Sequence, residues 1–163
     1  MNVRTDSVSV YVVRPDASGT SHEFLQLRRV ASERLGAGTF QNVRGGIEPD
    51  ETAWQAALRE LREETGMRPI EFYRLGTIET FYISQDDTLW HAVPFCAIVD
   101  RTHEITINDE HDAVRWVPLR EAKQTFIWSN EWPVIDEIQR VILGNGPAKP
   151  HLRIDVESAF TRP

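Results

Sequence analysis

The sequence predicts an α/β protein in which strands and helices pack as an α/β sandwich. Stretches rich in Val, Ile, Thr, Phe and Tyr recur along the chain, and they alternate with two longer stretches of helical periodicity. The 163 residues are 40% apolar and 26% charged, which suits one globular domain with a full hydrophobic core.

The first third of the chain predicts a pair of strands. Residues 7–13 alternate and then become apolar and β-branched, and Pro15 follows them closely. Residues 23–30 place Leu25 and Leu27 on one face, so they predict the partner strand. Residues 34–39 contain two glycines and predict a loop.

A helix follows over residues 53–65, and both of its ends carry sequence signals. Thr52 and Gln55 form a capping-box pattern at the start, and Gly66 supplies a left-handed residue that ends the helix. With about 100° of rotation per residue, three carboxylates gather opposite the apolar stripe. They are Glu60, Glu63 and Glu64.

Like charges three and four residues apart repel by a few tenths of a kcal/mol per pair. The acidic face is therefore either simply solvated or the site of a bound cation. Clustered carboxylate oxygens are the ligands that Mg²⁺ prefers, which makes a metal site the sharper hypothesis.

Further elements are predicted after this helix. Strand patterns cover residues 70–73, 76–83, 89–100, 105–107 and 113–117. Pro94 interrupts the most apolar of them and predicts a bulge or an edge position, because proline cannot donate to a ladder.

The end of the chain predicts a short helix from Pro118 and a longer one over residues 133–143, which Gly144 stops. Residues 145–163 lack sustained periodicity, so we expect a tail that lies on the surface or is partly disordered. The predicted domain is therefore residues 1–144.

Charge and cysteine content restrict the partners and the compartment. The net charge of −7 and the pI of about 5.2 argue against a nucleic-acid partner, because its phosphates would be repelled. Cys96 is the sole cysteine, which is compatible with a reducing cytosol. No stretch reads as a signal peptide or a membrane span, so we expect a cytoplasmic protein without a membrane partner. The sequence does not determine the oligomeric state.

The acidic helix and the loop before it also carry a longer pattern. The residues that match it are Gly45, Glu51, Arg59-Glu60-Leu61, Glu63-Glu64 and Gly66-Met67. They occupy every fixed position of the Nudix box, so the chain resembles the Nudix hydrolases. The resemblance implies the Nudix fold, an α/β/α sandwich with a mixed β-sheet between helices. It also implies an enzyme, a pyrophosphohydrolase that acts on a diphosphate linkage.

In this family the box binds a divalent metal, usually Mg²⁺ and possibly Mn²⁺. The implied ligands are the carboxylates of Glu60, Glu63 and Glu64 and the backbone carbonyl of Arg44. Glu51 and Arg59 are expected to pair and to brace the loop against the helix.

Such a site supports attack of water on a phosphorus atom. The metal lowers the pKa of bound water, and a carboxylate removes the proton. Glu63 or Glu64 is the predicted base. Glu110 is a further candidate as base and as metal ligand, because many Nudix enzymes place a carboxylate in this later part of the chain. It could equally be a solvated acid in the acidic stretch 109–112.

Short matches outside the box resemble the dihydroneopterin triphosphate and dATP pyrophosphohydrolase branch. They are Phe40-Gln41-Asn42-Val43, Glu110-His111 with Arg115-Trp116, and Trp128-Ser129-Asn130. The implied reaction splits a nucleoside or pterin triphosphate into monophosphate and pyrophosphate. Arg28 and Arg29 are expected near the substrate phosphates, or they are solvated at a strand end. Trp128 is expected to stack on the ring, although a tryptophan here can also serve packing.

Two alternatives to this reaction stay open. The substrate can instead be a dinucleoside polyphosphate or a nucleotide sugar, since the box does not select among them. A nucleotide-binding module without catalysis is the other alternative, and the intact acidic positions of the box argue against it.

Overall fold

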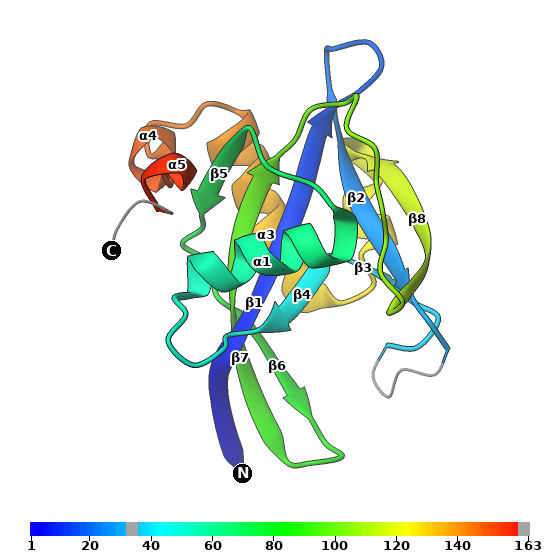
Figure 1. The fold of residues 1–163 in the computed structure, drawn as a ribbon, viewed down its shortest axis with the longest axis vertical. Coiled ribbons are helices and arrows are strands. Elements are labelled where there is room, and N and C mark those ends of the chain that lie inside the picture. The colour runs from blue at the N-terminus through cyan, green and yellow to red at the C-terminus, as the bar shows by residue number, and fades with distance from the viewer. Residues whose placement is uncertain (32–35, 160–163) are drawn as a thin grey trace.

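The computed structural model describes residues 1–31 and 36–159, which form one β-sheet with helices on both faces (Figure 1). The strands are β1 (Asn2–Pro15), β2 (His22–Arg29), β3 (Phe40–Gln41), β4 (Val43–Gly46), β5 (Glu71–Arg74), β6 (Glu79–Ile83), β7 (Thr88–Ile98) and β8 (His111–Pro118). The α-helices are α1 (Ala53–Thr65), α2 (Ala122–Thr125), α3 (Trp132–Glu137), α4 (Lys149–Leu152) and α5 (Val156–Ala159). Two 3₁₀ turns, η1 (Leu119–Glu121) and η2 (Ser129–Glu131), and a π-helical segment, η3 (Ile138–Leu143), complete the described elements.

The sheet is organised around β1. This strand pairs in antiparallel fashion with β2 and β4 and in parallel with β7. The other strands extend the sheet in antiparallel pairs, with β3 and β8 on β2 and with β5 and β6 on β7. One parallel pair within otherwise antiparallel pairing makes the sheet mixed, as the family resemblance predicted.

Successive residues of β1 point to opposite faces of the sheet and enter two separate cores. Val10 and Val12 pack in the core that includes Leu61 of α1. Tyr11 packs in the core that includes Ile135 of α3. Figure 1 shows α1 in front of the sheet and α3 behind it. The predicted α/β sandwich is therefore confirmed.

Residues 105–107 do not form the predicted strand. The backbone N–H of Thr106 donates to the carbonyl of Thr65 at 2.9 Å. The segment thus packs against the end of α1, and Ile105 and Ile107 contact the core beneath that helix. Its alternating pattern reflects packing on a helix end rather than pairing in a ladder.

The strand predicted for residues 76–83 begins only at Glu79. Its first residues are held elsewhere, because the backbone N–H groups of Gly76 and Thr77 donate to the carboxylate of Glu137 at 2.8 and 2.9 Å. These bonds take the segment out of the sheet before β6 starts.

Pro94 lies within β7, a central strand, rather than at a bulge or on an edge strand. On one side β7 pairs with β6 as far as Ala92 and with β5 from Phe95 onward. Pro94 falls between these partners, where its carbonyl accepts a hydrogen bond from Leu75 at 3.3 Å. The missing N–H therefore removes no ladder bond.

Of the loop predicted at 34–39, residues 34 and 35 lie outside the described residues.

The segment after Gly144 contains α4 and α5 and is attached to the domain. Leu152 packs in the core behind the sheet, and the N–H of Ile154 donates to Phe72 at 2.8 Å. The division of the chain at residue 144 stays a prediction.

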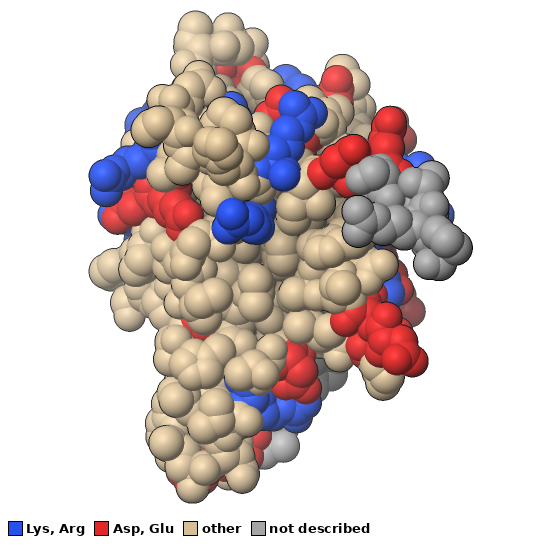
Figure 2. All heavy atoms as spheres, turned by 90° about the vertical axis from the view of Figure 1, so that its left-hand side faces the viewer, with Lys and Arg blue, Asp and Glu red and all other residues tan. Residues whose placement is uncertain are grey.

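Surface charge and helix length bear on possible partners. On the face shown in Figure 2, basic side chains lie among acidic ones and do not merge into a single basic surface. No helix in the described ranges 1–31 and 36–159 is long and apolar enough to cross a membrane.

Candidate active site

The loop before α1 is fixed to the helix by Arg59. Its guanidinium donates to both carboxylate oxygens of Glu51, each at 3.0 Å, and to the carbonyl of Gly46 at 2.8 Å. The predicted brace is confirmed. The helix also ends as predicted, because Gly66 adopts a left-handed conformation with φ of 71°.

The same guanidinium reaches the acidic face of α1. Its Nη1 donates to Glu60 at 2.8 Å and to Glu63 at 3.1 Å. One cation therefore lies among three carboxylates, those of Glu51, Glu60 and Glu63. Because of this excess of negative charge, the cluster retains capacity for a further cation.

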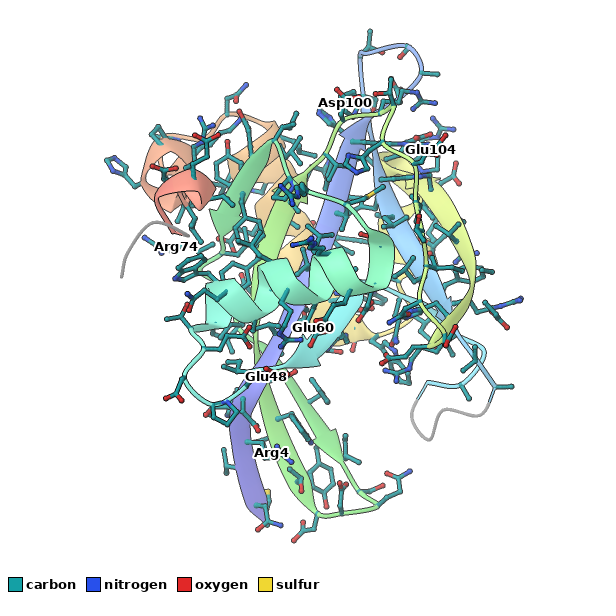
Figure 3. All side chains as sticks on the ribbon, in the orientation of Figure 1. Arg4, Glu48, Glu60, Arg74, Asp100 and Glu104 are labelled. Carbon is teal, nitrogen blue, oxygen red and sulfur yellow. The ribbon has the colours of Figure 1, made fainter. Side chains whose placement is uncertain are left out.

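Glu60 lies directly against the glycine that begins the box pattern. A Cβ placed on Gly45 would come within 1.9 Å of the Glu60 carboxyl carbon. Figure 3 shows Glu60 on the side of α1 that faces β4. Glycine is required at this position because any side chain would displace the carboxylate.

Glu64 departs from the prediction that all three carboxylates gather opposite the apolar stripe of the helix. Its side chain is 3% exposed, whereas that of Glu63 is 54% exposed. Glu64 turns toward the sheet, where its Oε1 accepts the backbone N–H of Arg44 at 3.4 Å and its Oε2 lies 3.7 Å from His111 Nε2. Among the described residues, Glu64 Oε2 has no hydrogen-bond partner.

Burial changes the acidity of two of these groups. It raises the pKa of Glu64 well above its usual range, and the neighbouring charges of Glu60 and Glu110 raise it further. Burial also raises the pKa of Glu60, although Arg59 opposes this shift. A bound cation would relieve the cost of keeping such carboxylates ionised.

The metal ligands predicted from the sequence are of the chemical type that a divalent cation prefers, but they do not form a preassembled coordination site. Within the described part of the chain, no three Asp, Glu, His or Cys side chains converge closely enough to form a preassembled metal site. Three features nevertheless favour a hard cation: an unpartnered buried carboxylate oxygen, a carboxylate seated on a glycine, and the excess of negative charge.

Glu110 belongs to the same electrostatic environment. It precedes β8, and its carbonyl accepts the N–H of Val30 at 3.0 Å. Its charge contributes to the raised pKa values of both Glu60 and Glu64. The charge of this residue, which is distant in sequence, thus acts on two carboxylates of α1.

A cleft of about 530 Å³ lies beside β4 and β6. Its lining includes Arg29, Arg44, Gly45, Tyr82, Trp128 and Asn130. Arg28 does not line this cleft, and its guanidinium instead donates to Asp112 at 2.6 Å. The cleft therefore joins cationic groups, the box glycine and an exposed tryptophan in one space.

The side chain of Arg44 binds two carboxylates that the sequence does not single out. Its guanidinium donates to Glu79 of β6 and, at 3.4 Å, to Glu131 of η2. Both carboxylates are 0% exposed. No local signal marks these acids, since each stands alone in its stretch of sequence and is buried only by the folded chain.

Comparison with known proteins establishes the family to which the chain belongs. The NUDIX domain family matches residues 3–138, which is most of the chain. The protein belongs to the Nudix family, and the prediction of a Nudix hydrolase is confirmed at that level.

The relatives that are similar in sequence include a mycobacterial protein and a mouse enzyme. The chain is 31% identical to the putative mutator protein MutT4 of Mycobacterium tuberculosis over 120 residues, which cover 71% of this chain and 48% of the relative. It thus spans about half the length of that relative. It is 34% identical to the asymmetrical bis(5'-nucleosyl)-tetraphosphatase of Mus musculus over 115 residues, covering 68% of this chain and 74% of the relative.

The solved structures that share the fold include two hydrolases. A binary complex of the C. elegans Ap4A hydrolase superposes with a TM-score of 0.70 at 19% identity, covering 88% of this chain and 99% of the other. The E. coli dihydroneopterin triphosphate pyrophosphohydrolase gives a TM-score of 0.65 at 23% identity, covering 87% and 95%. At these identities the likeness supports the fold alone.

Proposed function

We propose that this protein hydrolyses a nucleoside or pterin triphosphate to the monophosphate and pyrophosphate, with a divalent cation, Mg²⁺ or Mn²⁺. The observation that carries the proposal is the position of the Glu60 carboxylate on Gly45, at the wall of a cleft that also presents Arg29 and Trp128. A polyphosphate in this cleft would place its phosphates near the acidic face of α1.

The proposed ligands for the cation are Glu60, Glu63, Glu64, Glu110 and the backbone carbonyl of Arg44. When bound, such a cation would offset phosphate charge and lower the pKa of the attacking water. The proposed base is Glu63 or Glu64, with Glu110 as the further candidate. Burial raises the pKa of Glu64, which favours proton acceptance by this carboxylate.

Substrate binding is assigned to Arg28, Arg29 and Trp128. Arg29 and Trp128 already line the cleft, where a guanidinium can bind phosphate and an indole can stack on a ring. Arg28 would reach phosphate only after its bond to Asp112 is broken. We therefore expect Arg28 to contribute less than Arg29.

A second candidate substrate is a dinucleoside polyphosphate. The 34% identity with the mouse asymmetrical bis(5'-nucleosyl)-tetraphosphatase favours it, because that similarity covers 68% of this chain. The chemistry at phosphorus would be the same. Only the second nucleoside would need additional surface in the cleft.

Chromatography of reaction products tests the proposal. We expect dATP, dihydroneopterin triphosphate or both to give monophosphate and pyrophosphate with Mg²⁺, and no turnover with excess EDTA. Release of inorganic phosphate and a diphosphate, or cleavage of dinucleoside tetraphosphate or nucleotide sugar alone, would overturn the triphosphate assignment. Binding without metal-dependent turnover would favour the non-catalytic alternative.

We also propose that the protein acts in the cytoplasm on small molecules. The thiol of Cys96 is free and fully buried, and burial raises its pKa, so it is poorly reactive. Fractionation of cells that express a tagged chain would contradict this proposal if the protein were recovered outside the cytoplasm.

A further inference from the structure

A buried charged cluster adjoins the cleft, and the reaction proposed above uses none of its side chains. It consists of Arg44 on β4, Glu79 on β6 and Glu131 on η2. Both carboxylates are 0% exposed, and the Arg44 side chain is 16% exposed. Buried charges are costly, so each contact within the cluster calls for an explanation.

Glu79 is satisfied without Glu131. Its Oε1 accepts hydrogen bonds from Ser9 Oγ and Tyr11 Oη, both at 2.7 Å, and its Oε2 accepts one from Arg44. Arg44 also donates from Nε to the side-chain oxygen of Asn42 at 2.9 Å. Glu79 therefore neutralises Arg44, and Glu79 and Asn42 together orient it without Glu131.

Glu131 has a different set of partners. One oxygen, Oε1, lies 3.4 Å from Nη2 of Arg44, and the other, Oε2, accepts the backbone N–H of Trp128 at 3.3 Å. The N–H of Glu131 returns to the carbonyl of Trp128 at 3.0 Å. The carboxylate thus spans from strand β4 to the residue that presents the exposed indole.

Arg44 and Trp128, the two residues that Glu131 contacts, both line the cleft. Arg44 directly precedes Gly45, on which the Glu60 carboxylate is seated. Trp128 is 47% exposed and lines the same cleft. A fixed distance between them would fix the distance between a stacked ring and the phosphorus that reacts.

We propose that Glu131 is a positioning residue that holds Trp128 in register with the metal-binding end of the cleft. This inference rests on the proposed function, which assigns ring stacking to Trp128. It differs from a role in charge balance alone, because Glu79 already neutralises Arg44. A charge-balancing role predicts no energetic coupling between Glu131 and Trp128.

A double-mutant cycle measures that coupling. The variants are Glu131→Gln, Trp128→Ala and both together. The probe is α,β-methylene-ATP in Mg²⁺, whose dissociation constant does not require turnover. Glutamine keeps one acceptor oxygen for two donors, so one of the two contacts is lost.

We expect Glu131→Gln to weaken binding of the probe about tenfold and to lower kcat of the active substrate less than about twofold. In the Trp128→Ala background, the same substitution should weaken binding less than about twofold. Glu131→Asp should also weaken binding, because it retains the charge but shortens the link. Circular dichroism and Tm confirm that each variant is folded.

Glu137→Gln is the matched control. Glu137 lies on α3, close in sequence to Glu131, and likewise accepts two donors, the backbone N–H groups of Gly76 and Thr77. It does not line the cleft. Its effect on probe binding should be below about twofold and additive with Trp128→Ala.

Additive effects of Glu131→Gln and Trp128→Ala on probe binding would overturn the inference. If Glu131→Gln does not fold, binding of the probe by Glu131→Asp with wild-type affinity would overturn it instead. If the wild type turns over substrate but the two substitutions have additive effects on probe binding, the proposed function is retained and only the positioning role is excluded. If the two substitutions are coupled in probe binding but the wild type shows no turnover, the positioning role is supported and the proposed reaction is excluded. Failure of the wild type to bind the probe would contradict the positioning role and would exclude nucleoside triphosphates from the proposed substrates.

Discussion

Glu64 shows how burial sets the chemistry of a single carboxylate. It lies on the same helix as Glu63, one residue later, yet only 3% of its side chain is exposed. Burial raises its pKa, and one of its oxygens has no hydrogen-bond partner among the described residues. In the absence of a cation this arrangement costs stability, which is typical of a functional site.

Gly45 provides a test at the same scale. The Cβ of Gly45→Ala would displace the Glu60 carboxylate, which is the end of a flexible side chain and can swing away. We expect turnover to fall at least about tenfold, a barrier increase of ~1.4 kcal/mol, with less than about 1 kcal/mol lost in stability. Steady-state kinetics and thermal melts measure both.

Gly46→Ala is the matched control for that substitution. A Cβ on Gly46 meets its nearest atom, the carbonyl oxygen of Asp6, at 3.8 Å, which is an ordinary contact. Turnover by Gly46→Ala should stay within about twofold of wild type. Equal losses in both variants would contradict the specific role of Gly45.

The titration of Glu131 predicts a pH dependence of stability. Burial, opposed by Arg44 and assisted by Glu79, raises the pKa of Glu131 from 4.5 to about 7. Folding thus favours its protonated form, so its contribution is fully present below pH 4.5 and is lost as the pH rises through about 7. Glutamine cannot ionise and has no such loss.

The free energy of unfolding of Glu131→Gln, relative to wild type, should therefore increase between pH 5 and 8 by about 1–3 kcal/mol. Urea titrations at several pH values measure this difference. A difference that does not change with pH would show that Glu131 keeps the same charge throughout the range.

These buried acids also mark the limit of sequence-based prediction. Glu60, Glu63 and Glu64 were identifiable because their spacing on one helix is a local pattern. Glu79 and Glu131 are buried by strands and turns far away in sequence, and nothing next to either residue indicates this. The inward turn of Glu64 likewise depends on the packing of α1 on the sheet.

At the scale of elements, α1 and its preceding loop act as one unit. The helix boundaries were predictable, since Thr52 and Gly66 are local signals that the structure confirms: the N–H of Thr52 donates to Gln55 at 2.9 Å, and Gly66 ends the helix. Residues 105–107 were mispredicted because the contact that orders them, Thr106 to Thr65, joins distant segments.

Arg59→Ala tests the unity of this element. The substitution removes the donors to Glu51 and Gly46, and it leaves the carboxylates around Arg59 without their cation. We expect the free energy of unfolding to fall by about 1–2 kcal/mol and turnover to fall as well. Chemical denaturation and kinetics provide the two measurements.

Arg62→Ala serves as its control, because Arg62 is an exposed arginine on the same helix. Its stability should stay within about 0.5 kcal/mol of wild type. An unchanged stability of Arg59→Ala would count against the brace and would leave Arg59 only a local role in charge neutralisation.

At the scale of the whole molecule, β1 connects the two halves of the fold. It pairs with β4, which carries the box glycine, and with β7, which carries β6 and the wall of the cleft. The alternation of β1 predicted its burial, but its parallel pairing with β7 depends on the order of strands, which periodicity does not specify. The acidic helix and the cleft lie next to each other because β4 and β7 both pair with β1.

The central claim is that the acidic face of α1 binds the divalent cation on which hydrolysis depends. Binding of Mn²⁺, measured by electron paramagnetic resonance, tests it without relying on turnover. The variants are Glu63→Gln and Glu64→Gln, with Glu104→Gln as the control, because Glu104 is an exposed acid that does not lie on the acidic face of α1.

We expect wild type and Glu104→Gln to bind Mn²⁺ equally. Glu63→Gln and Glu64→Gln should bind it at least about tenfold more weakly, remain folded and lose nearly all turnover. Wild-type affinity in both Glu63→Gln and Glu64→Gln, or turnover within about twofold of wild type, less than ~0.5 kcal/mol of barrier, would contradict the account.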